Sequence, residues 1–255
     1  MQKKLCFKVV IAYNGASFAG WQEQKCNNSV TSVLKSRFSA LFKEEVSIIG
    51  ASRTDAGVHA RCQVAKICFK DFGLEAARLF DLWNKALPQD LIIKSFMPAG
   101  EAFHPQKNCL LKIYTYTLFY KKPDPLIAQF GYFLPMFEVS NFDLFEAALA
   151  LFQGSHDFFQ FFKSEDGAPK KTKRNIRFVN VVYDKNLFAY KITFAGKGFL
   201  RYQIRRMIGA AVEVALRKND SALQAIRISL AGQKSDVPTR CINAQGLCLE
   251  RIVYK

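Results

Sequence analysis

The sequence predicts an α+β fold made of two halves, because one order of strands and helices occurs twice along the chain. Stretches that alternate apolar and polar residues predict strands, and apolar residues that recur every three or four positions predict amphipathic helices. Residues 1–100 give the order strand–helix–strand–strand–helix–strand, and residues 101–255 repeat it. This is the split βαβ order of ferredoxin-like folds, so we expect two ferredoxin-like halves with antiparallel sheets. Pro98-Ala99-Gly100 marks the expected boundary between them.

The elements of the first half have clear start and stop signals. Asn14-Gly15 is a turn signal that ends the first strand, Ser29 occupies the N-cap position of the first helix, and Pro88 closes the second helix. The strands are expected at residues 5–12, 46–49, 63–69 and 91–97, and the helices at residues 30–43 and 74–87.

The second half follows the same rules. Its strands are expected at residues 110–120, 179–183, 188–194 and 247–253, and its helices at residues 142–152, 200–216 and 221–230. Four residues that alternate along its third strand are expected to share one face: Phe188, Tyr190, Ile192 and Phe194. The two halves share this order of elements but no repeated sequence.

The composition favours a polyanionic partner. Lys and Arg exceed Asp and Glu by 37 − 21 = 16, and the isoelectric point is about 9.6. Each phosphate that such a surface neutralises releases counterions and adds affinity that does not depend on base sequence. Half of the residues are apolar, which excludes disorder for most of the length. A nucleic acid is therefore the preferred partner, and an ordinary basic protein is the alternative.

The seven cysteines are widely spaced and form no Cys-x-x-Cys pair. This pattern argues against a disulfide framework and a structural zinc site, and favours reduced thiols in a cytosol. The N-terminal residues lack the long apolar segment of a signal peptide, and no stretch elsewhere is long enough to span a bilayer. We therefore expect a cytoplasmic protein without a membrane partner.

Residues 50–60 are the most informative stretch, and they read GASRTDAGVHA between two expected strands. The predicted tight loop holds one carboxylate, Asp55, two residues after a cation, Arg53. Taken alone, a single Asp in such a loop is usually a turn or helix-cap residue. The neighbouring residues change this interpretation, because the seven residues RTDAGVH match an active-site motif.

These seven residues closely resemble the active-site motif of the TruA-type tRNA pseudouridine synthase family, in which the Asp is the catalytic nucleophile. The resemblance extends along nearly the whole chain. The other matching segments are Tyr13-Asn14-Gly15 with Gly20-Trp21-Gln22, Asn84 with Leu87-Pro88, Phe103-His104, Lys112 with Tyr114 and Tyr116, Gly154-Ser155-His156-Asp157-Phe158, Phe199-Leu200 with Arg205, and Gly246-Leu247.

The resemblance implies a tRNA pseudouridine synthase that isomerises uridine to pseudouridine in the anticodon stem-loop, at positions 38–40. It also implies a homodimer that binds tRNA, sheets that meet at a central basic cleft, and a target uridine that is flipped out of its stack. The reaction breaks the N1–C1′ bond and rejoins the base to the ribose through C5. No redox or group-transfer step is involved, so no cofactor is chemically required.

The resemblance assigns three catalytic residues. Asp55 is the nucleophile, and it can add to C6 of the uracil or attack C1′ of the ribose, a choice that the sequence leaves open. Arg205 lies beside the apolar stripe of its helix, where it would be partly enclosed and would keep Asp55 ionised. Tyr114 and Tyr116 share one strand face, and the resemblance selects Tyr114. Its ring would stack on the flipped base, and its hydroxyl would accept the C5 proton directly or through water.

Further residues are expected to bind the substrate. Arg53 would contact a backbone phosphate or hold the extruded base out of the helix, and a loop-bracing role is also open. A basic run is expected to be either a solvated loop or a flap that contacts phosphates: Lys170, Lys171, Lys173 and Arg174.

The sequence departs from the family pattern at three positions. Asn14 replaces the usual Asp of the first motif, and Ser52 replaces a Gly before Arg53. Gln106 stands where the family commonly carries an arginine, which removes one expected RNA contact, and Lys107 would compensate for it. His59 and His156 also match family positions, but scattered histidines are more often structural, and neither is assigned a catalytic role.

Two other functions remain open. One is a related synthase that acts on other tRNA positions or on another RNA, which the composition does not distinguish. The other is a non-catalytic RNA-binding protein on the same scaffold, which charge and aromatic strands support equally well. Asp55 argues against the second, because a binding protein has no need for a carboxylate where it would repel phosphate.

Overall fold

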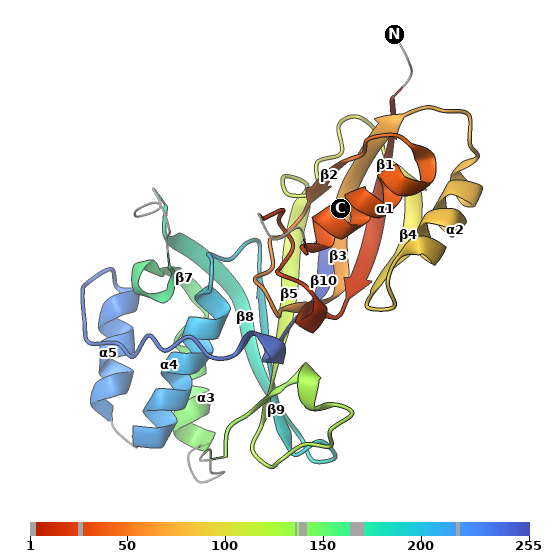
Figure 1. Ribbon diagram of the computed structural model, residues 1–255. Helices are drawn as coiled ribbons and strands as arrows, with labels where there is room; N and C mark the ends of the chain where they lie inside the picture. Colours follow the sequence, from red (N-terminus) through yellow and green to blue (C-terminus); the bar gives the residue numbers. More distant parts are fainter. Residues whose placement is uncertain (1–3, 25–27, 136, 138–141, 164–170, 218–219) are drawn as a thin grey trace. The chain divides into compact units, whose positions relative to one another are not determined.

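The computed structural model describes residues 4–24, 28–135, 137, 142–163, 171–217 and 220–255. The chain divides into two compact units, which Figure 1 shows with their helices and strands labelled. The first unit is Met1–Leu110 with Cys248–Lys255, and the second is Leu111–Leu247. The division falls inside a strand, ten residues after the Pro98-Ala99-Gly100 segment where we expected it, and the last strand of the chain returns to the first unit.

The first unit has the expected split βαβ order. Its strands are β1 (Lys4–Tyr13), β2 (Ser47–Gly50), β3 (His59–Lys70), β4 (Leu91–Pro98) and β10 (Leu247–Tyr254), and its helices are α1 (Val30–Phe42) and α2 (Ala76–Ala86). β1 lies between β4 and β3, and β2 pairs with β3, all antiparallel. This is the strand order 4-1-3-2 that the split βαβ pattern predicts. β10 adds a parallel strand beside the beginning of β3.

Both helices of the first unit begin and pack as their sequences predict. The Ser29 side chain accepts a hydrogen bond from the backbone of Ser32, which caps α1. α1 and α2 meet where the rings of Phe38 and Trp83 pack edge to face, 4.8 Å apart, and the Trp83 indole donates to the carbonyl of Leu34. Phe38 also contacts Phe69 on β3, so the two helices cover the sheet with a common aromatic core.

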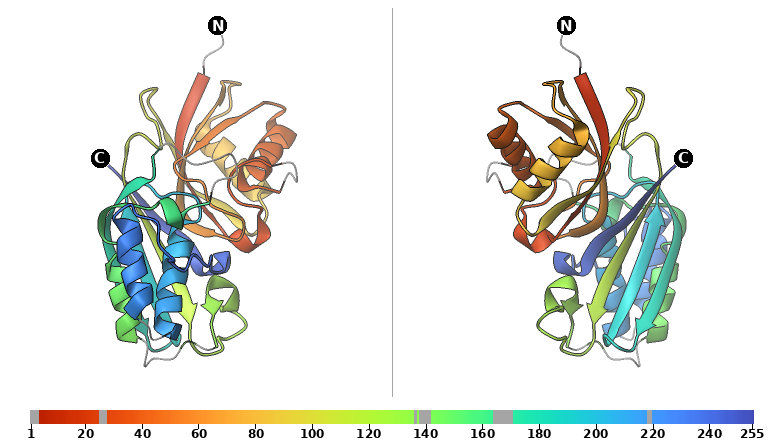
Figure 2. Two further views of the ribbon diagram at one scale, coloured as in Figure 1. Left: turned by 90° about the vertical axis from the view of Figure 1, so that its left-hand side faces the viewer. Right: turned by 90° about the vertical axis from the view of Figure 1, so that its right-hand side faces the viewer.

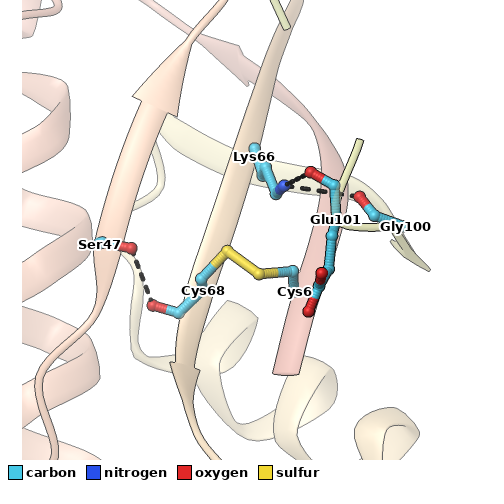
Figure 3. The surroundings of a disulfide bond; sticks show 6 residues. All are labelled: Cys6, Ser47, Lys66, Cys68, Gly100 and Glu101. Atoms are coloured by element: carbon cyan, nitrogen blue, oxygen red, sulfur yellow. Dashed lines mark hydrogen bonds between the residues drawn. A yellow bond between two sulfur atoms is a disulfide. The ribbon is translucent and has the colours of Figure 1, made fainter. Parts of the chain in front are cut away.

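One prediction about the cysteines is wrong, because Cys6 and Cys68 form a disulfide (Figure 3). The two residues are 62 positions apart in sequence, but the register of β1 on β3 places them directly opposite each other, with 4.2 Å between their Cα atoms. Directly opposed residues on antiparallel strands lie close enough for this bond. The other described cysteines are free thiols: Cys62, Cys109, Cys241 and Cys248.

The second unit contains mainly antiparallel strands and three helices, and strand pairing places its strands in the same ten-stranded sheet as those of the first unit. Its strands are β5 (Cys109–Phe119), β6 (Tyr132–Phe133), β7 (Gly154–Asp157), β8 (Lys173–Asp184) and β9 (Ala189–Gly196), and its helices are α3 (Phe142–Ala150), α4 (Gln203–Arg217) and α5 (Asp220–Leu230). The order is β5-β9-β8-β7, and the short β6 lies parallel to β5. The three helices lie on one face of this sheet (Figure 2). The fold is therefore α+β, as predicted.

Several details of the second unit differ from the prediction. β7 was not expected, because its four residues are too short to show a period. β8 begins at Lys173 rather than at 179, and it extends through a stretch of charged residues. Phe188 precedes β9 with φ of +49° and is 43% exposed, so it does not share the buried face of Tyr190, Ile192 and Phe194. Within the described residues, no helix combines the length and apolar character that crossing a membrane requires.

Candidate active site

Asp55 stands at the first position of a tight turn between β2 and β3. The backbone N–H of Val58 donates to the Asp55 carbonyl at 3.2 Å, and Gly57 takes φ of +80°. A turn with a left-handed third residue is of type II, and glycine is the residue that adopts this conformation without steric cost. The Asp55 side chain is half-buried. Gly57 therefore stands two residues after Asp55 because the third position of this turn requires a left-handed backbone conformation.

The residues before this turn are fixed to β3 by a buried glutamine. The Gln63 side chain is fully buried, and its amide donates to the carbonyl of Ser52 at 2.6 Å while its Oε1 accepts from the Ser52 N–H at 3.2 Å. The N–H of Ala51 also donates to the carbonyl of Val64. A buried polar group without a hydrogen bond costs free energy, so this pair of hydrogen bonds holds the loop in one position. Ser52, which departs from the family pattern, fits here with its side chain buried.

The N-terminal segment 13–21 holds the other side of the loop. The Tyr13 hydroxyl and the Thr54 Oγ1 are 2.7 Å apart, and the N–H of Trp21 donates to the Thr54 carbonyl at 3.1 Å. Two glycines allow this close approach. A Cβ at Gly15 would lie 2.2 Å from the carbonyl oxygen of Val58, and one at Gly20 would lie 2.8 Å from that of Thr54. The Tyr-Asn-Gly and Gly-Trp-Gln motifs thus act together by supporting the Asp55 loop.

The three histidines have structural contacts. Nδ1 of the buried His59 accepts from the N–H of Gly15 at 3.1 Å. Nδ1 of His104 accepts from the N–H groups of Gln106 and Lys107, which forms the turn after β4. Nε2 of His156 lies 2.8 Å from the carbonyl of Gln153. Each histidine ring is thus placed by a contact with the backbone.

Arg53 lines a polar pocket of the first unit. Its side chain is exposed, and among the described residues it forms no hydrogen bond or ion pair. The pocket has a volume of about 160 Å³ and is also lined by Trp21, Lys35 and Gln106. An exposed guanidinium without a partner among the described residues is available to an anion or to a nucleobase.

The two candidate tyrosines on β5 differ in their contacts. Tyr116 is fully buried, and its hydroxyl donates to the carbonyl of Asn243 at 2.8 Å. Burial raises the pKa of the Tyr116 phenol well above its usual value, and the nearby charge of Arg205 opposes this only in part. Tyr114 is 5% exposed and packs edge to face on Phe199, 5.4 Å between ring centroids. Tyr116 is therefore a structural residue that holds the segment before β10.

Arg205 occupies the first turn of α4, beside the buried Ile204 and Met207, and is half-buried as expected. Its Nε donates to the carbonyl of Ile242 at 2.8 Å, and its guanidinium lies over the ring of Tyr202. The hydrogen bond from Nε to Ile242 therefore fixes the orientation of the Arg205 guanidinium. The structure brings Tyr114 and Arg205 into the second unit, whereas Arg53 and Asp55 share one loop of the first.

The remaining basic residues differ in exposure. Lys107 is exposed in the first unit, and Lys171 and Lys173 are exposed at the start of β8. Arg174 is half-buried, donates to the carbonyls of Lys171 and Lys173, and has a pKa lowered by burial. Arg174 therefore braces this turn. Lys170 lies outside the described residues.

Gln106 has a contact that the sequence did not reveal. The family pattern indicated only the loss of an arginine here, but the Gln106 amide donates to the carbonyl of Gly50 at 3.0 Å, at the entrance to the Asp55 loop. The sequence showed that Gln106 departs from the family pattern. It did not show what Gln106 contacts, because Gly50 lies 56 residues away along the chain. Within the part of the chain that the structure describes, no three His, Cys, Asp or Glu side chains gather closely enough to hold a metal ion.

The chain is similar to a large group of known proteins over nearly its full length. The sequence model of the family described as tRNA pseudouridine synthase matches residues 9–106 and 148–255. A protein named tRNA pseudouridine synthase A 1 from Protochlamydia amoebophila (strain UWE25) is 31% identical over 98% of this chain and 96% of its own. Proteins named tRNA pseudouridine synthase A from Acetivibrio thermocellus and Citrifermentans bemidjiense are also 31% identical, each over 97% of this chain and over 98% and 97% of their own.

Proposed function

The chain belongs to the tRNA pseudouridine synthase family, whose members are isomerases, and we propose that it converts uridine to pseudouridine in the anticodon stem-loop of tRNA, at positions 38–40. One observation carries the proposal to this chain. The carboxylate of Asp55 stands on a turn that is held from both sides by buried partners, Gln63 through Ser52 and Tyr13 through Thr54. Such fixed placement is what a nucleophile requires.

We propose Asp55 as that nucleophile. Its carboxylate adds to C6 of the uracil or attacks C1′ of the ribose, and either route forms a covalent intermediate that divides the difficult step in two. The N1–C1′ bond breaks, a C5–C1′ bond forms, C5 loses its proton and N1 gains one. The reaction is an isomerisation, so atoms and electrons balance within the nucleotide. Beyond the nucleophile, it requires only groups that transfer protons and a site that holds the uracil in place.

We assign the other roles from the resemblance and from local environment. Tyr114 stacks on the flipped base and accepts the C5 proton, and the edge-to-face contact with Phe199 holds its ring. Arg205 keeps the nucleophilic carboxylate ionised, and its bond to Ile242 orients the guanidinium. Arg53 contacts a phosphate or the extruded base, and its lack of a partner among the described residues leaves it available.

The excess of 16 positive charges supports RNA as the partner, with phosphate contacts that place the substrate without reading its sequence. We propose that Lys107, Lys170, Lys171 and Lys173 supply such contacts. Arg174 is a weaker candidate, because it already donates to two carbonyls. A homodimer remains a prediction that rests on the resemblance. A cytoplasmic location remains a prediction from the N-terminal sequence and the cysteine pattern, and the Cys6–Cys68 disulfide removes part of the support from the cysteines.

The first experiment measures tritium release from tRNA transcripts labelled at uridine C5, without added metal or nucleotide. Wild type is expected to release tritium, and Asp55→Asn is expected to bind the tRNA without releasing it. Asp81→Asn, on the exposed surface of α2, is the matched control and should act as wild type does. Mapping of the product then tests positions 38–40. Binding by wild type without release on every tRNA would favour a non-catalytic RNA-binding protein instead.

A further inference from the structure

Tyr202 has a backbone conformation that its side chain disfavours. Its φ is +62°, and among the described residues two other non-glycine residues have a positive φ, Lys43 and Phe188. In this left-handed region the Cβ of an L-residue crowds the following carbonyl oxygen, so that glycine adopts it routinely and a bulky residue does not. Lys43 caps the C-terminus of α1, a common place for a left-handed residue. Tyr202 instead stands directly before the first residue of α4.

The conformation of Tyr202 is fixed by a turn that leads into α4. The N–H of Gln203 donates to the carbonyl of Leu200 at 3.2 Å, which makes Tyr202 the third residue of a type II turn. This position requires a positive φ and favours glycine. The Gln203 side chain is fully buried, and its Oε1 accepts from the N–H of Leu200 at 2.7 Å. Two hydrogen bonds between Leu200 and Gln203 thus hold Tyr202 in the left-handed conformation.

The ring of Tyr202 contacts the guanidinium to which we assign a catalytic role. The Cζ atom of Arg205 lies 5.3 Å from the ring centroid, within the range of a cation–π contact. The Nε of Arg205 donates to the carbonyl of Ile242 at 2.8 Å. The Ile242 carbonyl therefore holds one edge of the guanidinium, and the Tyr202 ring limits its movement on another side.

The Tyr202 ring is itself held in place. The Nη2 of Arg201 donates to the Tyr202 hydroxyl at 3.1 Å, and the Arg201 Cζ lies 4.9 Å from the centroid of the same ring. The Tyr202 carbonyl accepts from the N–H of Arg206 at 3.0 Å in the first turn of α4. A change of φ would turn the Cα–Cβ bond of Tyr202 and carry the ring elsewhere. The left-handed turn is therefore what places the ring beside Arg205.

We propose that Tyr202 is a positioning residue, which keeps an unfavourable backbone conformation in order to hold the Arg205 guanidinium in one orientation. Backbone strain that the surrounding structure maintains is a recurrent feature of functional sites. Glycine would form the same turn without strain, but it has no ring to place beside Arg205. The strain thus lowers stability while it fixes the guanidinium. This inference rests on the proposed function in taking Arg205 as a catalytic group.

Tyr202→Gly separates these two effects, because it removes the strain and the ring together. The full-length variant should unfold at the same urea concentration as wild type or at a higher one. Its kcat for tritium release should fall about tenfold and its KM for tRNA should change less than about twofold, because the guanidinium is less well placed while the RNA contacts remain. Tyr202→Phe keeps the ring and should recover most of the lost rate. A residue that served only the fold would lose stability and activity together.

Lys43→Gly is the matched control, since Lys43 is exposed, has φ of +57° and lies in the other unit. It should also keep or raise the urea midpoint, and it should release tritium at the rate of wild type. A second measurement does not depend on activity. It follows the NMR resonance of the Arg205 Nε–H in isotope-labelled protein, identified by its loss in Arg205→Lys. Tyr202→Gly should shift this resonance, because a nearby aromatic ring changes the chemical shift of a proton, and Lys43→Gly should leave it in place.

The outcomes distinguish this inference from the proposed function. A wild-type kcat in Tyr202→Gly overturns the positioning role, and so does a loss of activity accompanied by a lower urea midpoint. An Arg205 resonance that Tyr202→Gly leaves in place overturns it whatever the activity. If wild type releases no tritium from any tRNA but Tyr202→Gly shifts the resonance, the placement of Arg205 by Tyr202 is supported and the proposed function is contradicted.

Discussion

The hydroxyl of Tyr13, at the end of β1, lies 2.7 Å from the Oγ1 of Thr54, the residue before Asp55. Both side chains are buried, with exposed fractions of 5% and 7%. The contact joins the first strand of the chain to the loop that carries the proposed nucleophile, 41 residues later. It explains why a tyrosine at this strand end matters to a loop that it does not adjoin in sequence.

Removal of the Tyr13 hydroxyl should weaken both stability and catalysis. Tyr13→Phe leaves the Thr54 hydroxyl buried without this partner, which costs about 1–3 kcal/mol. We expect the free energy of unfolding in urea to fall by that amount, and kcat to fall because the loop is less well held. Thr54→Val removes the other partner. A double variant whose loss equals the sum of the two single losses would show that the contact contributes nothing of its own.

Gly57→Ala tests the turn that positions Asp55. An alanine in the left-handed conformation costs about 1–2 kcal/mol, so the protein should lose stability, and the turn should shift to relieve it. Small shifts of a nucleophile lower rates steeply, and we expect kcat to fall about tenfold to a hundredfold. Gly73→Ala is a matched control outside this loop, because Gly73 has φ of +81° and a Cβ added there would have no atom within 4 Å. Equal activity in the two variants would contradict the prediction.

The disulfide should stabilise the first unit. A bond that closes a loop of 62 residues restricts the unfolded chain, and such bonds typically contribute about 2–4 kcal/mol. Urea unfolding of wild type should therefore shift to lower urea on addition of a reductant. The Cys6→Ala, Cys68→Ala double variant should unfold at that lower midpoint with or without reductant. The exposed Cys241 provides the control, since Cys241→Ser should leave the response to reductant unchanged.

Cys248 should resist alkylation until strongly alkaline pH. Burial, aided by the charge of Glu250, raises the pKa of the Cys248 thiol to about 12. The thiolate is the reactive form, so a raised pKa means that reactivity appears only as pH rises towards 12. At a pH of about 8 to 9, near the pKa of an ordinary thiol, iodoacetamide should label the exposed Cys241 and spare Cys248, as read by peptide mass spectrometry. Labelling of both cysteines at equal rates under these conditions would contradict this.

Local sequence patterns were sufficient to predict those helices and strands that are long or have a clear start or stop signal. The N-cap at Ser29, the turn at Asn14-Gly15 and the order of the first six elements were all predicted, because capping and periodicity act within a few residues. The tight loop that carries Asp55 between two strands was also predicted, and the structure shows the turn that forms it. Gly57 takes the left-handed conformation that this turn requires, and a glycine at that position is visible in the sequence.

Other features depend on residues that are distant in sequence. Cys6 bonds to Cys68 because of strand register, and Gln106 reaches Gly50 across 56 residues. β7 has only four residues, too few for a period, and forms because β8 offers it an antiparallel partner.

The sequence by itself determined the α+β class, the split βαβ order of the first unit and the tight loop around Asp55, since each depends on neighbouring residues. Only the tertiary structure decided how Tyr13, Gln63 and Trp21 hold that motif in place. It also shows different contacts for Tyr114 and Tyr116, which share a strand face: Tyr116 bonds to the carbonyl of Asn243, and Tyr114 packs on Phe199. The physical reason is that hydrogen bonds and close contacts between distant segments depend on register and packing, which no local pattern encodes.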